Sequence, residues 1–136
     1  MLMNTNGLLH HIEIYVSNLE DTTNFWKWLL TEKFTYLLFQ QWEYGISFKI
    51  DDTYLVFVQT EQKYLQNKYN RKNIGLNHLA FHCDSSEFVD MLTQDLLDKN
   101  IKILYDDKHP FAGGDNYYAV YFEDPDRIKV EVIFSK

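Results

Sequence analysis

An internal repeat constrains the fold of this chain more than any other feature of its sequence. Placing His11 on His78 brings the two halves of the chain into register, and we call this displacement the short shift. The short shift holds through a predicted strand and through the helix that follows it, so we expect two copies of one structural module. The positions that it pairs are His11 with His78, Phe25 with Leu92, Leu29 with Leu96, Leu30 with Leu97, and Phe34 with Ile101.

The two copies differ in length near their ends. There a larger displacement, which we call the long shift, places Asp51-Asp52 on Asp126-Arg127. The second copy therefore contains about eight additional residues, and the loop at 106–116, with its proline and glycines, is their natural place. Under the long shift, Val56 takes the position that Glu131 has in the second copy.

Each copy is predicted to form one strand, one helix and three further strands, from alternating apolar residues and from apolar residues three and four apart. In the first copy we expect strands at 9–16, 34–41, 44–50 and 54–59, and a helix of about three turns capped by Ser17 with Leu19, Phe25, Trp26, Leu29 and Leu30 on its apolar side. In the second we expect strands at 76–83, 102–105, 117–123 and 128–134, and a helix from Asp84 or Ser85 to Lys99-Asn100 with Phe88, Met91, Leu92, Leu96 and Leu97 on its apolar side. The polar residues 61–73 are expected to form a connector with room for a short helical turn.

Glu131 lies in the middle of the last predicted strand, among apolar neighbours. An ionised carboxylate in such a strand costs free energy unless a cation or a hydrogen-bond donor meets it. The two histidines at equivalent positions of the repeat, His11 and His78, are the best candidate partners. The remaining histidines, which alternation or the loop places elsewhere, are secondary candidates: His10, His82 and His109.

Composition and charge exclude several classes of partner. The net charge is −7, from 20 acidic and 13 basic residues, which opposes binding to nucleic acid or to anionic lipid. No run approaches the ~18 apolar residues of a membrane span, and residues 1–7 lack the pattern of a signal peptide. The single cysteine, Cys83, excludes an internal disulfide. We therefore expect a cytoplasmic protein that binds a small molecule.

Three stretches resemble the vicinal oxygen chelate superfamily, which includes glyoxalase I, extradiol dioxygenases, fosfomycin resistance proteins and bleomycin-binding proteins. They are HIEIYVSNL at 11–19, GLNHLAF at 75–81, and YFEDPD at 121–126 leading to Glu131. The resemblance implies an α+β fold of two βαβββ modules, whose mixed, curled sheets form a cup around a divalent metal. It further implies one domain over residues 8–135, with modules at about 8–60 and 75–135 and a connector at 61–74.

The resemblance also implies a metal-ligand set. The family places ligands on the first and last strands of each module, which are His11, His78 and Glu131 in this sequence. Val56 stands where a four-ligand member such as glyoxalase I has a glutamate, which weakens the case for the glyoxalase I reaction. Two histidines and one carboxylate hold a divalent first-row metal and leave positions open for a bidentate oxygen substrate. Fe, Mn, Ni and Zn all remain candidates.

Two functional hypotheses follow. The first is a metal-dependent enzyme acting on a small oxygen-bearing molecule, by isomerase or lyase chemistry or by ring-cleaving dioxygenase chemistry. Glu13, on the His11 side of its strand, is a candidate general base, and Tyr121 lies where extradiol dioxygenases have a substrate-side tyrosine. The second is a metal-free small-molecule binding protein of the bleomycin-resistance type. Because modules of this kind pair within one chain or across two, we expect a homodimer.

Overall fold

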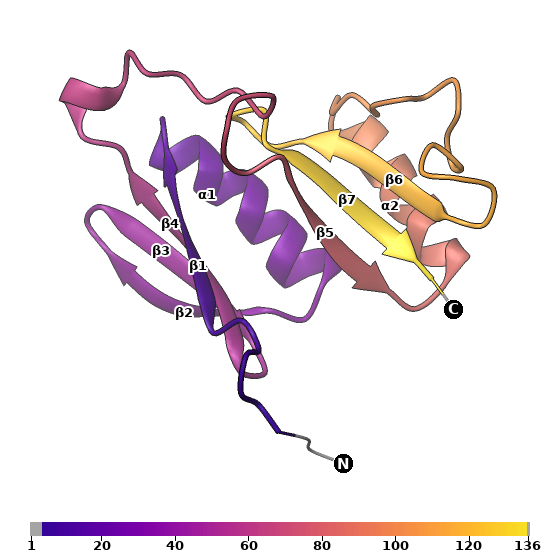
Figure 1. Cartoon of the computed structure of the whole chain (residues 1–136), viewed down its shortest axis with the longest axis horizontal. Helices are drawn as coiled ribbons and strands as arrows, with labels where there is room; N and C mark the ends of the chain where they lie inside the picture. The colour runs from indigo at the N-terminus through magenta and orange to yellow at the C-terminus, as the bar shows by residue number, and fades with distance from the viewer. Residues whose placement is uncertain (1–3, 136) are drawn as a thin grey trace. The chain divides into compact units, whose positions relative to one another are not determined.

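The computed structural model of the chain describes residues 4–135 and confirms the α+β class (Figure 1). It contains two compact units, which are separated in sequence between Asn67 and Lys68, inside the predicted connector. Each unit has one small, curled, mixed sheet and one principal helix. The short helical turn expected in the connector is the 3-10 helix η2 (Gln62–Tyr64).

The first unit contains a four-stranded sheet with the order β1-β4-β3-β2. β1 pairs with β4 in parallel, and the other two pairs are antiparallel. A two-residue turn at Asp51-Asp52 joins β3 to β4, and Asp51 has a φ of 47°, which aspartate tolerates better than most residues. The four strands lie close to their predicted positions: β1 (His11–Val16), β2 (Leu37–Trp42), β3 (Gly45–Ile50) and β4 (Thr53–Gln59).

The helix α1 (Leu19–Lys27) packs against β3 and β4 and continues directly into the π-helix η1 (Trp28–Lys33). Trp26 is fully buried and stacks on Phe57 of β4, with ring centroids 5.1 Å apart. The wider π-helical turn brings adjacent side chains to the same side of the helix, so η1 buries three consecutive residues. These are Trp28, Leu29 and Leu30.

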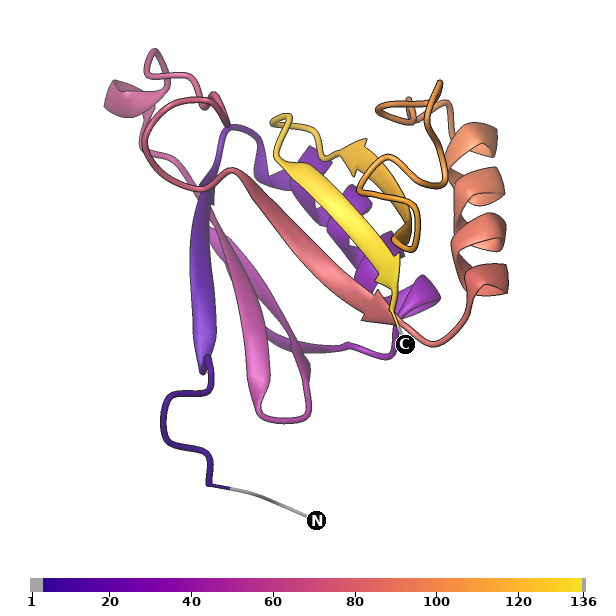
Figure 2. The same ribbon diagram turned by 45° about the vertical axis from the view of Figure 1, so that its right-hand side comes forward.

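The second unit contains a three-stranded sheet with the order β5-β7-β6 (Figure 2). Its strands are β5 (His78–Cys83), β6 (Tyr118–Glu123) and β7 (Lys129–Phe134). The prediction of a strand at 102–105 is wrong. Leu104 donates one backbone hydrogen bond to Tyr121 O at 2.8 Å, but Tyr105 has a φ of 56°, which turns the chain away before a ladder forms. The second unit therefore has three strands where four were expected.

The helix α2 (Ser86–Asp98) packs against β6 and β7 of its own sheet. Its C-terminus is a Schellman motif, as the Lys99-Asn100 prediction implied: Asn100 has a φ of 61°, and Ile101 N donates to Leu96 O at 2.9 Å. The apolar side was predicted only in part. Val89, Leu92 and Leu96 are buried, whereas Met91 and Leu97 are about half exposed because they lie outside this stripe. Within residues 4–135, no helix is long and apolar enough to cross a membrane.

The two helices begin at equivalent caps. Asn18 Oδ1 accepts from the backbone of Asp21, and Ser85 Oγ accepts from the backbone of Phe88, both at 3.1 Å. The short shift places Asn18 on Ser85, so the two caps are equivalent positions of the repeat. Ser17 is therefore not the cap of the first helix, because its neighbour Asn18 has the extended backbone and the acceptor that an N-cap requires.

The strand register repeats as well. His11 is the register partner of Tyr54 in the parallel pair β1–β4, and His78 is the partner of Lys129 in the parallel pair β5–β7. The short shift takes His11 to His78, and the long shift takes Tyr54 to Lys129. Both shifts found in the sequence therefore correspond to the same parallel pairing in two sheets.

Candidate functional site

Glu131 is a buried carboxylate at the centre of the second sheet, with 3% of its surface exposed. The hydroxyl group of Tyr117 donates a hydrogen bond to Glu131 Oε2. Tyr121, on the neighbouring strand β6, is the register partner of Glu131. On the other side, His78 Nε2 lies 3.4 Å from Glu131 Oε1. The carboxylate thus has the partners that its position in an apolar strand requires, and one of the two predicted histidines is among them.

The loop at 106–116 borders this carboxylate through its small residues. Ala112 packs against the buried cluster of Ala119, Tyr121 and Ile133. At Gly113, an added Cβ would lie 2.4 Å from Tyr117 Cδ1 and 2.7 Å from the Tyr121 hydroxyl oxygen, so only glycine allows this approach. The loop insertion that distinguishes the second copy therefore supports the two tyrosines beside Glu131.

Both tyrosines keep their hydroxyl protons at neutral pH. The pKa of Tyr117 is raised to about 12, first by its hydrogen bond to Glu131 and then by burial and by the charge of Glu131. The pKa of Tyr121 is also raised to about 12, first by burial and then by the charge of Glu131. Tyr121 was a catalytic candidate from sequence, whereas Tyr117 was not among the predicted site residues. Tyr117 directly precedes β6, so its place beside Glu131 follows from the structure and was not fixed by strand alternation.

Asn77 fixes the position of the His78 ring proton. The Asn77 amide nitrogen donates to Arg71 O at 3.0 Å, which leaves Asn77 Oδ1 as the acceptor 2.8 Å from His78 Nδ1. Neutral His78 therefore has its proton on Nδ1, and its Nε2 presents a lone pair towards Glu131.

The pair His78–Glu131 has the chemistry of two adjacent metal ligands. A neutral Nε2 and a carboxylate oxygen are both acceptors, and their separation of 3.4 Å is longer than an ordinary hydrogen bond. A cation between them, a proton or a metal ion, removes the repulsion. Two ligand atoms that each lie about 2.1 Å from one tetrahedral metal ion are themselves about 3.4 Å apart. Imidazole and carboxylate are both common ligands of first-row divalent metals.

His11 and Glu13 lie on one side of β1, as alternation predicted, and Ile14 and Val16 are buried on the other side. The His11 ring stacks on Tyr54, with centroids 4.7 Å apart and planes 3° from parallel. Our expectation for His10 was wrong: it was placed away from His11, but its Nδ1 lies 2.8 Å from His11 Nδ1. His10 precedes the regular strand, so alternation does not govern its direction.

Glu13 is the register partner of Val56, and Ala80 is the register partner of Glu131. Under the two shifts of the repeat, Glu13 corresponds to Ala80 and Val56 corresponds to Glu131. Each unit therefore has one carboxylate at this pair of register positions. In the first unit it is on β1, and in the second unit it is on β7. Neighbouring strands are about 4.8 Å apart, so Glu13 lies beside the position that Val56 leaves without a carboxylate.

The described residues contain no group of three or more His, Cys, Asp or Glu side chains arranged to hold a metal ion. The structure brings His78 and Glu131 together within the second unit, and His11 and Glu13 lie in the first unit. His82 is exposed on the same side of β5 as His78, and its register partner on β7 is Ile133, beyond Glu131.

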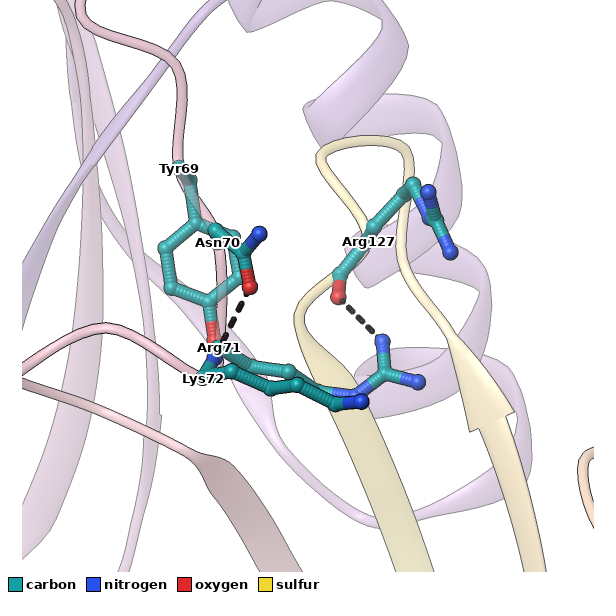
Figure 3. A pocket seen from close by; sticks show the side chains of 5 residues that line it. All are labelled: Tyr69, Asn70, Arg71, Lys72 and Arg127. Carbon is teal, nitrogen blue, oxygen red and sulfur yellow. Dashed lines mark hydrogen bonds between the residues drawn. The ribbon is translucent and has the colours of Figure 1, made fainter.

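A cavity of about 270 Å³ lies beside the segment that precedes His78 (Figure 3). Arg71 reaches across it to donate to Arg127 O at 3.1 Å and to pair with Glu123. These contacts fix the backbone whose carbonyl oxygen accepts from Asn77. The residues that line the cavity are Tyr69, Asn70, Arg71, Lys72 and Arg127.

Comparisons with known proteins agree with this architecture. The sequence matches the model of the Glyoxalase/Bleomycin resistance protein/Dioxygenase superfamily over residues 8–132. The uncharacterized protein YqjT of Bacillus subtilis (strain 168) is 53% identical over 125 residues, which are 92% of this chain and 97% of that protein. A crystal structure from Bacillus halodurans, provisionally named a glyoxalase, is 53% identical with a TM-score of 0.94, covering 96% of this chain and 98% of that one.

More distant solved structures share the fold. The fosfomycin resistance protein FosX from Listeria monocytogenes is 20% identical with a TM-score of 0.69, covering 100% of this chain and 96% of its own. Lactoylglutathione lyase from Agrobacterium tumefaciens is 18% identical with a TM-score of 0.66, covering 95% of this chain and 94% of its own. At these identities the likeness concerns the fold alone.

Proposed function

Since the chain belongs to the Glyoxalase/Bleomycin resistance protein/Dioxygenase superfamily, we propose that it is a cytoplasmic metal-dependent enzyme acting on a small oxygen-bearing molecule. A divalent ion would be held by His11, His78 and Glu131. The observation that supports this most directly is the lone pair of His78 Nε2, which faces a buried carboxylate oxygen at 3.4 Å.

The donor set suits a first-row divalent metal such as Fe, Mn, Ni or Zn. When bound, such an ion supplies Lewis-acid polarisation of a substrate oxygen. The residues of this chain supply the rest. Tyr117 orients Glu131 as a donor, and Asn77 directs the lone pair of His78 towards it. The carboxylate of Glu131 is shielded from water, since only 3% of this residue is exposed.

Glu13 is the proposed general base. It lies on the His11 side of β1, and it is opposite Val56, which occupies the repeat position of Glu131. A carboxylate there can accept a proton from a substrate bound beside His11. Tyr121 is the second proposed catalytic residue: a phenol with a pKa of about 12 keeps its proton at neutral pH, so it can donate a hydrogen bond or a proton but does not act as the base.

The proposed ligand set requires both units. His11 belongs to the first, and His78 and Glu131 belong to the second. Either both units of one chain, acting as a single domain over residues 8–135, or units from two chains of a homodimer would complete the set. The ligand set leaves metal positions open for two adjacent substrate oxygens, and it is compatible with the isomerase, lyase and ring-cleaving dioxygenase hypotheses alike.

Elemental analysis of protein purified without chelator tests this proposal. We expect one equivalent of a first-row metal in the wild-type protein, its loss in His78→Ala, and its retention in His82→Ala, a control that removes a histidine from the same side of β5. Absence of metal, together with no change in thermal stability on adding Mn²⁺, Fe²⁺, Ni²⁺ or Zn²⁺, would reject the enzyme and favour a metal-free small-molecule binding protein.

A further inference from the structure

The residues just before the two proposed histidine ligands make the same contact. The short shift relates His10 to Asn77, as it relates His11 to His78. Asn77 Oδ1 lies 2.8 Å from His78 Nδ1, and His10 Nδ1 lies 2.8 Å from His11 Nδ1. Each of the two units therefore places a side-chain partner on the Nδ1 atom of its strand histidine, although the partners differ in chemistry.

In the second unit the direction of this hydrogen bond is fixed. Asn77 is an acceptor towards His78 because its amide nitrogen is used by Arg71 O. Arg71 is itself anchored through its guanidinium group, which donates to Arg127 O (Figure 3) and pairs with Glu123. A chain of fixed contacts thus keeps the proton of His78 on Nδ1 and leaves Nε2 free to bind a cation.

In the first unit the contact allows two directions. Either His11 Nδ1–H donates to His10, or His10 Nδ1–H donates to His11. In the first case His11 has its lone pair on Nε2. In the second case the proton of neutral His11 is on Nε2, its Nδ1 lone pair is already used by His10, and neither ring nitrogen can accept a metal ion.

We infer that His10 is a positioning residue, which accepts the Nδ1 proton of His11 and so directs the His11 Nε2 lone pair to the ligand, as Asn77 does for His78. This inference rests on the proposed function for its purpose, because the direction of the hydrogen bond matters only if His11 binds a cation. The direction itself is a property of the metal-free protein and can be measured there.

The test is ¹⁵N NMR of the histidine rings in metal-free full-length protein at about pH 8, where neutral imidazole predominates. We expect protonated Nδ1 at both His11 and His78 in the wild-type protein. In His10→Leu the acceptor is lost, and the proton of His11 should shift towards Nε2. In His10→Asn, which copies the second unit, it should remain on Nδ1. His10→Ala repeats the test if leucine disturbs the fold.

Titration with Mn²⁺ supplies the second measurement. His10→Leu should bind about 10 to 100 times more weakly than wild type, and His10→Asn within about threefold of it, as expected for a partner that orients a ligand. His82→Ala should match wild type in both measurements. A His11 ring protonated on Nε2 in the wild-type protein, or one that His10→Leu leaves unchanged, overturns the inference. If no form binds metal, the proposed function fails, while the NMR result still decides the role of His10.

Discussion

Glu13 lies directly opposite Val56 across the parallel pair β1–β4, at the place where the second sheet has Ala80 opposite Glu131. The two copies of the repeat have exchanged the strand that holds the carboxylate. This exchange places Glu13 beside Val56, two residues from His11 on the same side of β1, without making it the equivalent of Glu131. A base near the ligands, separate from them, is the arrangement that the proposed reaction needs.

Restoring a carboxylate at Val56 should create a fourth ligand. Val56 is 5% exposed, so Val56→Glu should destabilise the metal-free protein by roughly 3 kcal/mol, the cost of a buried charge without a partner. Mn²⁺ should raise the melting temperature of the variant by several degrees more than that of wild type, since each tenfold gain in affinity adds about 1.4 kcal/mol. Thermal denaturation with and without Mn²⁺ measures both effects.

The matched control is Val58→Glu, which places the same side chain one pleat farther along β4, opposite Tyr15. It should lower the melting temperature without an added response to Mn²⁺. Equal responses of the two variants, or none in Val56→Glu, would show that Val56 is not beside the metal site.

Glu131→Gln should remove metal binding while preserving the fold. The amide keeps the size of the side chain and still offers an oxygen to Tyr117, so the melting temperature of the metal-free protein should change by less than about 3 °C. Affinity for Mn²⁺, measured by calorimetric titration, should fall by more than about 100-fold, beyond the loss expected for a residue that only orients a ligand. Glu43→Gln, an exposed change of the same charge, is the control, and retained affinity in Glu131→Gln would contradict the ligand assignment.

The raised pKa values predict a loss of stability at high pH. For Tyr117 the pKa rises from 10.0 to about 12 in the folded state, so the folded protein retains a proton that the unfolded chain has lost. The stabilisation is complete below pH about 10 and decreases as the pH approaches about 12. Urea denaturation across this range should show a falling free energy of unfolding, with a smaller slope in Tyr117→Phe.

Tyr118 provides the comparison for this experiment. A hydrogen bond to Asp90, with burial and the charges of Asp90 and Glu87, raises its pKa to about 12 as well. Tyr118→Phe should therefore also reduce the slope. Only Tyr117→Phe should weaken Mn²⁺ binding, by about tenfold, because Tyr117 donates to Glu131 whereas Tyr118 donates to Asp90. Equal metal affinity in the two variants would remove Tyr117 from the site.

The equivalent helix caps make a prediction about stability alone. Asn18→Ala and Ser85→Ala should each lower the free energy of unfolding by about 1 kcal/mol, because each leaves a backbone N–H of the first turn without its acceptor. The exchanges Asn18→Ser and Ser85→Asn should cost less than about 0.5 kcal/mol. Urea denaturation measures these differences. A larger loss for Ser17→Ala than for Asn18→Ala would contradict the observed cap.

Much of the fold was predictable because its signals are local. The alternation in β1 and the apolar spacing of α1 and α2 follow from the geometry of strands and helices, and the repeat located their equivalents. The failures have physical causes of the same kind. Residues 102–105 have the composition of a strand, but a strand forms only where a partner offers a continuous ladder, and Tyr105 turns away.

Part of the site was predictable, because the free-energy cost of burying a carboxylate requires a partner for it. Glu131 needed a partner, and His78 is one. Tyr117 could not be identified with certainty from sequence, because a tyrosine in an aromatic-rich chain has many possible environments. The contact between His10 and His11 was missed because His10 lies outside the strand, where no period fixes the direction of a side chain.

The sequence by itself determined the two modules, the order of their elements apart from the strand expected at 102–105, and the two histidines at equivalent points, because hydrophobic period and internal repeat can be read along the chain alone. Only the tertiary structure decided which groups meet Glu131 and which nitrogen of His78 is protonated. Those outcomes depend on strand register and on hydrogen bonds such as Asn77 to Arg71 O, which join residues through space and leave no period in the chain.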